Sequence, residues 1–188
     1  MSYVPKRDQI PNLLTWTRVV AIPPLLVAAW LPGDMARMTA VGLFMAVALT
    51  DWLDGYLARR WQVHSDFGAF LDPVADKLLV AAVLLVLLVQ MPGVVMLISV
   101  VVIVSREIFV SALREWMAGK GMREQVKVSS LGKWKTTFQM LAILVLLAAQ
   151  PQSVLANLGQ LLLLVAAALT LISLAEYIRG AIRALRLN

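Results

Sequence analysis

Six long apolar runs, separated by short helix-breaking stretches, limit what this chain can fold into. The runs cover approximately residues 10–31, 37–59, 68–90, 93–116, 134–149 and 153–178. A transmembrane helix needs about 20 mostly apolar residues. The chain of 188 residues is 61% hydrophobic, more than a soluble core of this length would bury. Pro32, Pro92 and Pro151 interrupt the pattern between runs. The sequence therefore predicts an all-α integral membrane protein, one domain (1–188) with six transmembrane helices.

The basic residues predict the orientation of these helices, because Lys and Arg collect on the cytoplasmic side of a membrane. With the N-terminus inside, all of the 17 Lys and Arg residues except Arg37 fall at inner helix ends or inner loops. Both termini are therefore expected in the cytoplasm. The net charge of +6 is spread along the membrane boundary, which favours anionic lipid over nucleic acid as a partner. Without cysteine, disulfides, thiolate metal sites and a cysteine nucleophile are excluded.

Four aspartates occur at regular spacings where two of the predicted helices meet. Asp51 and Asp54 lie about 60° apart around one helix, and Asp72 and Asp76 lie about 40° apart around the next. Because a short turn joins these helices, the carboxylates can face one another near the cytoplasmic boundary. They would repel each other there unless cations neutralise them. Hard oxygen ligands favour Mg²⁺ or Mn²⁺, and a pair of such ions suits displacement at a phosphoryl group.

Two simpler explanations of these acids stay open at this point. Ion pairs with Arg59, Arg60 or Lys77 at the helix ends would account for one or two of the four. A small cation carrier could also hold acids within the membrane, although such acids are expected near the bilayer midplane, between repeats. The sequence shows no convincing internal repeat.

The spacing of the acids extends to a longer pattern with a known counterpart. Eight fixed residues resemble the signature of the CDP-alcohol phosphotransferases: Asp51-x2-Asp54-Gly55-x2-Ala58-Arg59-x8-Gly68-x3-Asp72-x3-Asp76. The resemblance implies a six-helix membrane fold that usually forms a homodimer. It also implies transfer of a substituted phosphate from a CDP-linked donor to an alcohol, with release of CMP.

The same resemblance implies roles for individual residues. The four aspartates would hold two Mg²⁺ ions, with Mn²⁺ as the alternative metal, and Asp76 would also be the general base for the acceptor hydroxyl. Gly55 and Arg59 would contact the CDP part of the donor, and Ser65 would add a further donor contact. Physical chemistry agrees, since glycine leaves room for a nucleotide and arginine can bind two diphosphate oxygens at once.

The first apolar run begins with a polar segment that has two interpretations. Asn12 can cap the helix, which is sufficient to explain it. Thr15 and Arg18 lie one helical turn apart at the entrance to the membrane, where an arginine is costly without an anionic partner. Contact with the donor and simple capping both fit. The segment resembles the PNxLTxxR opening of bacterial phosphatidylglycerophosphate synthases, a branch of the same family.

Basic residues also gather from the fourth run to the fifth. Arg106 and Arg114 lie about 80° apart around a helix and can share one broad side of it. The set that could form an anion pocket consists of Arg106, Arg114, Lys127, Lys133 and Lys135. The alternative is positive charge that follows the topology, with an ion pair of Arg106 with Glu107 or pairing to Glu115. This alternative accounts poorly for Arg106, because that residue should lie deeper than the loop.

Two further segments, SREIFVSALREW and GKWKTTFQ, resemble the phosphatidylglycerophosphate synthases. The resemblance implies transfer of the phosphatidyl group of CDP-diacylglycerol to sn-glycerol 3-phosphate, which yields phosphatidylglycerophosphate and CMP. It implies a homodimer in the bacterial inner membrane with its active site on the cytoplasmic side. Inositol phosphate, serine or another phospholipid are alternative acceptors, and serine would require less positive charge.

Overall fold

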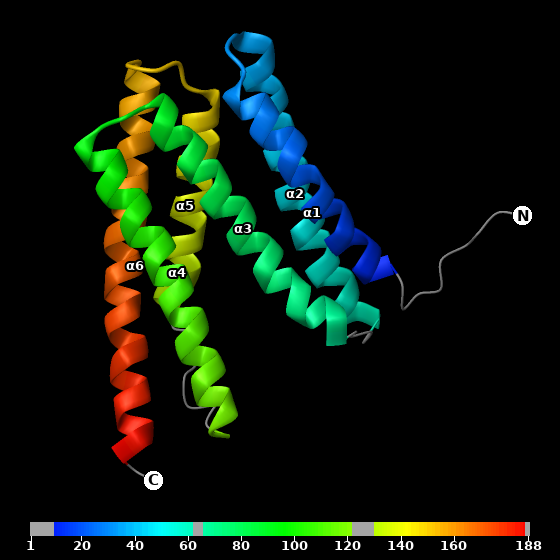
Figure 1. The fold of residues 1–188 in the computed structure, drawn as a ribbon, viewed down its shortest axis with the longest axis vertical. Helices are drawn as coiled ribbons and strands as arrows, with labels where there is room; N and C mark the ends of the chain where they lie inside the picture. Colours follow the sequence, from blue (N-terminus) through cyan, green and yellow to red (C-terminus); the bar gives the residue numbers. More distant parts are fainter. Residues whose placement is uncertain (1–9, 62–65, 122–129, 187–188) are drawn as a thin grey trace, which may run out of the picture. The chain divides into compact units, whose positions relative to one another are not determined.

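The computed structural model describes residues 10–61, 66–121 and 130–186. These residues form six helices and no strand, so the predicted all-α architecture is confirmed (Figure 1). The helices are α1 (Ile10–Trp30), α2 (Asp34–Trp61), α3 (Asp66–Gln90), α4 (Val94–Gly119), α5 (Ser130–Ala148) and α6 (Val154–Arg186).

The helices end where the sequence predicts breaks. Gly33, between α1 and α2, has φ +106°, and Gln152, between α5 and α6, has φ +64°. Both values are rare for ordinary residues and mark tight turns. The Ser153 hydroxyl then accepts a 3.1 Å hydrogen bond from the Ala156 N–H and caps α6. Only α6 departs clearly from its predicted bounds, because it continues to Arg186. A helix satisfies its own backbone and needs no apolar surroundings to continue.

The helices have the character of membrane spans. Among the described residues, three stretches are long and apolar enough to cross a bilayer: Pro73–Gln90, Val94–Gly119 and Val154–Arg183. Two shorter apolar stretches are Trp16–Trp30 and Trp134–Ala148. Large apolar side chains such as Met35, Val94 and Val154 are more than 70% exposed, as expected of lipid-facing positions. The membrane character is confirmed, while the number of six spans stays a prediction.

The chain divides into two compact units, and the first contains α1, α2 and most of α3. Helix α1 packs antiparallel against α2 (Figure 1). Leu25, Phe44 and Val83 are buried in this unit. Buried alanines, including Ala28 and Ala40, let helix backbones approach closely, as small residues do in membranes.

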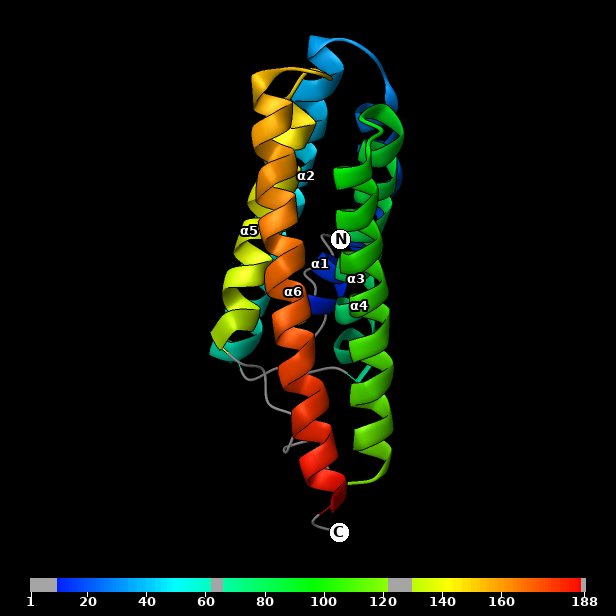
Figure 2. The same cartoon turned by 90° about the vertical axis from the view of Figure 1, so that its left-hand side faces the viewer.

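The second unit begins at the end of α3 and contains α4, α5 and α6. Helix α6 packs antiparallel against α5 and also contacts α4 (Figure 2). A Cβ added at Gly159 of α6 would lie 2.7 Å from Cγ of Leu146 in α5, so the two helices meet there without room for a side chain. Further along α6, Tyr177 packs with Val110 and Met117 of α4. The prediction of a single domain is not tested by this division and stays a prediction.

Candidate active site

The first unit brings an arginine and two aspartates together from three helices. Arg18 of α1 lies with Nη2 2.9 Å from Oδ1 of Asp51 in α2. Its Nη1 donates a 2.8 Å hydrogen bond to Oδ1 of Asp76 in α3. The arginine side chain is 1% exposed, whereas the two carboxylates are 49% and 47% exposed. We call Arg18, Asp51 and Asp76 the acidic cluster.

The geometry of the acidic cluster suits a divalent cation. Because both carboxylates contact one guanidinium, Asp51 and Asp76 lie close together, and both remain half exposed. One positive charge faces two negative charges, so the cluster as a whole attracts cations. Oxygen donors of this kind are those that Mg²⁺ and Mn²⁺ prefer. The two described acids therefore fit the predicted metal site.

The other predicted metal ligands cannot be compared in the same way. Asp54 lies in α2 and Asp72 in α3, but their side chains are outside the described part of the chain. Among the residues whose side chains are described, no group of three or more His, Cys, Asp or Glu could hold an ion. A four-carboxylate site therefore stays a prediction, of which two members are observed near each other.

Most of the residues predicted to bind the donor also fall outside the described side chains. These are Asn12, Thr15, Gly55, Arg59 and Ser65. Arg18 is the exception. The expectation that it needs an anionic partner is met within the protein itself, by Asp51 and Asp76. Its contact with the donor stays a prediction.

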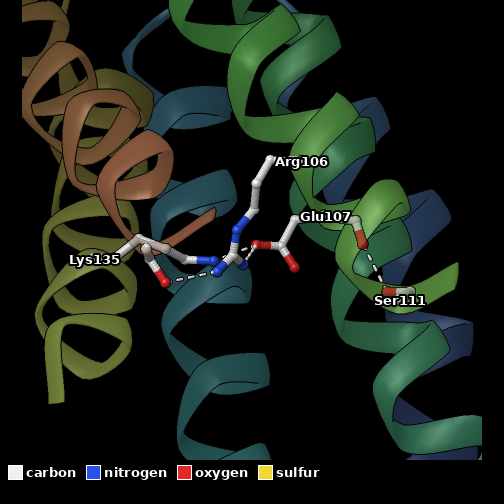
Figure 3. Close-up of polar contacts among 5 residues, drawn as sticks. Arg106, Glu107, Ser111 and Lys135 are labelled. Atoms are coloured by element: carbon white, nitrogen blue, oxygen red, sulfur yellow. Dashed lines mark hydrogen bonds and ion pairs between the residues drawn. The ribbon is translucent and has the colours of Figure 1, made fainter. Parts of the chain in front are cut away.

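The second unit contains a separate group of ionised side chains, shown in Figure 3. Nη1 of Arg106 in α4 donates a 3.0 Å hydrogen bond to Oε1 of the neighbouring Glu107. The ammonium group of Lys135 in α5 donates to the same carboxylate oxygen. Nη2 of Arg106 donates a 2.9 Å hydrogen bond to the hydroxyl of Ser173 in α6. We call Arg106, Glu107 and Lys135 the basic cluster.

The basic cluster is well buried for a group of charges. The side chains of Arg106 and Lys135 are each 7% exposed, and that of Glu107 is 23% exposed. The guanidinium carbon of Arg106 also lies 5.5 Å from the ring centroid of Tyr177. Isolated charges in such surroundings are strongly unfavourable, so mutual pairing is what makes this burial possible.

The structure separates the predicted acceptor residues. Arg106 is buried and Arg114 is exposed, so these two residues of α4 lie in different surroundings. Lys135 joins Arg106 through Glu107. The side chains of Lys127 and Lys133 are outside the described part of the chain.

The sequence did not indicate that Glu107 belongs to a site. It indicated only that Glu107 could pair with Arg106, its neighbour in the chain. The contact of Glu107 with Lys135 joins residues 28 positions apart in two helices, which no local spacing reveals. The available signal was the residue itself, because an acid within a transmembrane run is costly and usually has a specific partner.

Comparison with known proteins defines the class to which this site belongs. Residues 8–172 match the model of the CDP-alcohol phosphatidyltransferase family. Since the match covers most of the chain, the protein belongs to this family of membrane-embedded enzymes, and the resemblance of the aspartate signature is confirmed. The family is generally dependent on divalent metals.

Individual relatives narrow the class further. The chain is 45% identical over 172 residues to the CDP-diacylglycerol–glycerol-3-phosphate 3-phosphatidyltransferase of Sodalis glossinidius, covering 92% of this chain and 94% of that protein. It is 44% identical to the protein of the same name from Haemophilus influenzae, with 92% of each chain covered. It is 43% identical to a cardiolipin synthase (CMP-forming) of Oryza sativa subsp. japonica, where it spans 58% of that protein's length.

Proposed function

We propose that this enzyme transfers the phosphatidyl group of CDP-diacylglycerol to sn-glycerol 3-phosphate, giving phosphatidylglycerophosphate and CMP. The observation that carries the proposal is the acidic cluster, in which carboxylates from α2 and α3 meet beside a buried arginine. Relatives named for this reaction cover 92% of the chain at 44 and 45% identity, which supports the choice of substrates.

On the donor side, we assign Asp51, Asp54, Asp72 and Asp76 to two Mg²⁺ ions, with Mn²⁺ as a possible substitute. When bound, the ions supply neutralisation of the charge on the donor diphosphate. The residues assigned to the CDP part of the donor are Asn12, Thr15, Arg18, Gly55, Arg59 and Ser65. The acyl chains of the donor need no enclosed pocket, because they can stay in the bilayer.

The chemical step is attack of an acceptor hydroxyl on the β-phosphorus of the donor. A new phosphorus–oxygen bond forms while the bond to CMP breaks, and Asp76 takes the proton of the attacking hydroxyl. The contact with Arg18 supports this role, since it fixes one carboxylate oxygen of Asp76 and leaves the side chain 47% exposed.

On the acceptor side, we assign the phosphate of sn-glycerol 3-phosphate to Arg106. The weaker candidates are Arg114, Lys127, Lys133 and Lys135. An arginine can present two parallel N–H groups to a phosphate, which gives both affinity and orientation. The burial of Arg106 supports this assignment, because charge–charge attraction is stronger where water is scarce.

We also propose that the enzyme is a homodimer in the bacterial inner membrane. Both termini and the active site would lie on the cytoplasmic side. The homodimer is inferred from the family resemblance alone. The distribution of Lys and Arg along the sequence supports the orientation, and the bacterial relatives support the choice of membrane.

A second candidate function is CMP-forming cardiolipin synthesis, with a phospholipid as the acceptor. The likeness to the rice protein favours it. The basic cluster favours the first candidate, because a terminal phosphate monoester presents more acceptor oxygens to Arg106 and Lys135 than the bridging phosphodiester of a phospholipid does.

The test is CMP release by the purified protein in lipid, given CDP-diacylglycerol and Mg²⁺. The acceptors compared are sn-glycerol 3-phosphate, inositol phosphate, serine, phosphatidylglycerol and none. We expect release with sn-glycerol 3-phosphate alone, loss of release with a chelator, and recovery on adding Mg²⁺. Release only with a different acceptor would replace the substrate assignment. Absence of CMP release under every condition would overturn the proposal.

A further inference from the structure

We propose that Glu107 is a positioning residue that holds Arg106 and Lys135 together as a cation pair for the phosphate of the acceptor. The inference rests on the proposed function, and it adds a residue that contacts neither substrate. Glu107 acts through the two basic side chains that it holds.

The central observation is that a single oxygen joins the two cations. Oε1 of Glu107 accepts a hydrogen bond from Arg106, its neighbour in α4, and another from Lys135 in α5 (Figure 3). Without the carboxylate, two buried positive charges would repel each other and separate. With it, both cations stay within hydrogen-bond reach of the same atom. Glu107 thus fixes the distance between the two groups.

The contacts of Arg106 fix the orientation of the guanidinium and leave one of its three nitrogens without a partner within the described ranges. Nη1 is bound to Glu107 and Nη2 to Ser173. The guanidinium also lies over the ring of Tyr177. Nε is buried and has no hydrogen-bond partner among the residues that the structure describes. A buried donor without an acceptor is unfavourable, so this edge of Arg106 is suited to an anionic oxygen.

The second unit contains further buried polar atoms. Ser99 Oγ in α4, Gln139 Oε1 in α5 and Thr170 Oγ1 in α6 are buried, and none of them has a hydrogen-bond partner in the described part of the chain. Polar side chains inside a transmembrane helix group are costly and mark substrate or ion sites. The interior of the second unit therefore offers hydrogen-bonding groups to a polar ligand.

The net charge of the basic cluster favours an anionic ligand. Two cations share one carboxylate, so one positive charge is not balanced within the cluster. A phosphate monoester carries up to two negative charges near neutral pH and offers several acceptor oxygens. A ligand such as glycerol, which has hydroxyls and no charge, would leave the imbalance in place.

The first experiment measures CMP release as each substrate is varied, for Glu107→Ala and Glu107→Gln. For Glu107→Ala we expect the KM for sn-glycerol 3-phosphate to rise about 10- to 100-fold, with the KM for CDP-diacylglycerol and kcat within about twofold. Glu107→Gln keeps a side-chain oxygen and should lie between Glu107→Ala and the wild type. Glu115→Gln, which changes an exposed acid of the same helix, is the matched control and should match the wild type.

A purely structural role of Glu107 predicts a different pattern. Loss of an ion pair that only joins α4 to α5 would lower kcat and the amount of folded protein, with both KM values unchanged or raised together. That pattern would overturn the inference. An unchanged or lower KM for sn-glycerol 3-phosphate in Glu107→Ala would overturn it as well, since the extra positive charge would then outweigh positioning.

A binding measurement separates this inference from the proposed function. Calorimetric titration with sn-glycerol 3-phosphate, inorganic phosphate and glycerol needs no turnover. We expect both phosphates to bind the wild type, and to bind Glu107→Gln more weakly, while glycerol binds neither. If the wild type released no CMP with sn-glycerol 3-phosphate, the proposed function would fail, and the titration with inorganic phosphate would still decide the role of Glu107. Equal phosphate affinity of wild type and Glu107→Gln would overturn that role.

Discussion

The acidic cluster and the basic cluster have the same pattern with the charges reversed. In the first unit, the arginine Arg18 lies between two carboxylates from other helices. In the second unit, one carboxylate of Glu107 lies between the cations of Arg106 and Lys135. Each central residue prevents repulsion between its two partners, and the formal charges sum to −1 over the acidic cluster and to +1 over the basic cluster. The first cluster therefore attracts cations and the second attracts anions.

The two clusters differ in which members meet the solvent. The outer carboxylates of the acidic cluster are about half exposed around a buried arginine. The outer cations of the basic cluster are buried, and the central carboxylate is the more exposed member. The acids are thus open to an ion from water, while the cations act at short range on a ligand that has already entered. Under the proposed function, this difference suits the first unit to binding metal and the second to selecting the acceptor.

The most severe change should be Asp76→Asn in the acidic cluster. The amide cannot take the proton of the attacking hydroxyl, so we expect CMP release to fall about 10³-fold while the protein stays folded. Asp34→Asn, which changes a 79% exposed aspartate at the start of α2, is the control. Near-normal CMP release by Asp76→Asn would remove the chemical role from this cluster.

Replacing the central cation tests whether Arg18 substitutes for a metal ion. In Arg18→Met, two neighbouring carboxylates lose their shared cation. We expect the free energy of unfolding to fall by about 2 kcal/mol, less than for a fully buried pair because both acids are half exposed. Mg²⁺ should restore part of this loss, as measured by thermal unfolding with chelator and with Mg²⁺.

The matched control for Arg18→Met is Arg37→Met, which removes an arginine paired with Asp34 near the opposite end of α2. This control should lose little stability in either condition, since ion pairs near the surface contribute little. An equal loss by Arg18→Met with and without Mg²⁺ would contradict the cation-seeking character of the acidic cluster.

Close packing, in addition to charge, should distinguish the second unit. Gly159→Ala places a methyl group against Leu146, and we expect a loss of about 1 to 2 kcal/mol in the free energy of unfolding. Gly42→Ala in α2 meets no atom within 4 Å and should be neutral or slightly stabilising. Denaturation of the two variants side by side gives the difference. Equal stability would mean that α5 and α6 adjust freely at Gly159.

The smallest expected effect is that of removing the hydrogen bond between Arg106 and Ser173. Ser173→Ala removes the hydroxyl that accepts the Nη2 hydrogen bond of Arg106, and we expect the KM for sn-glycerol 3-phosphate to rise about threefold with kcat unchanged. Ser111→Ala is the control, because that hydroxyl bonds only the backbone carbonyl of Glu107 among the described residues. A similar rise in both variants would show that the measurement reports general disturbance of α4 and α6.

The fold was predictable because apolar length and helix breakers are local signals. Five of the six helices end close to the predicted positions, and the turns at Gly33 and Gln152 lie in the predicted breaks. The length of α6 beyond residue 178 was missed, because hydropathy reports the membrane boundary and not the end of the hydrogen-bonded helix. Apolar content and helix length are separate properties.

The site was predictable where its residues share a short pattern. The signature placed Asp51 and Asp76 together, and both contact Arg18 in the structure. The sequence did not show that Asp51 and Asp76 are the partners of Arg18, since helix periodicity cannot show which residues of other helices face it. The link from Glu107 to Lys135 was missed for the same reason. Contacts between helices depend on how the helices pack, which spacing along one helix does not determine.

The contact of Arg18 with Asp76 has a consequence for how the chain enters the membrane. These residues are 58 positions apart, so α1 leaves the ribosome long before α3 exists. At about 5 to 20 residues per second, the guanidinium waits roughly 3 to 12 s for its second carboxylate. During that interval its charge must remain near the headgroups or beside the insertion machinery, since an arginine at the centre of the bilayer is costly. The first three helices therefore reach their final arrangement only after the third has been synthesised.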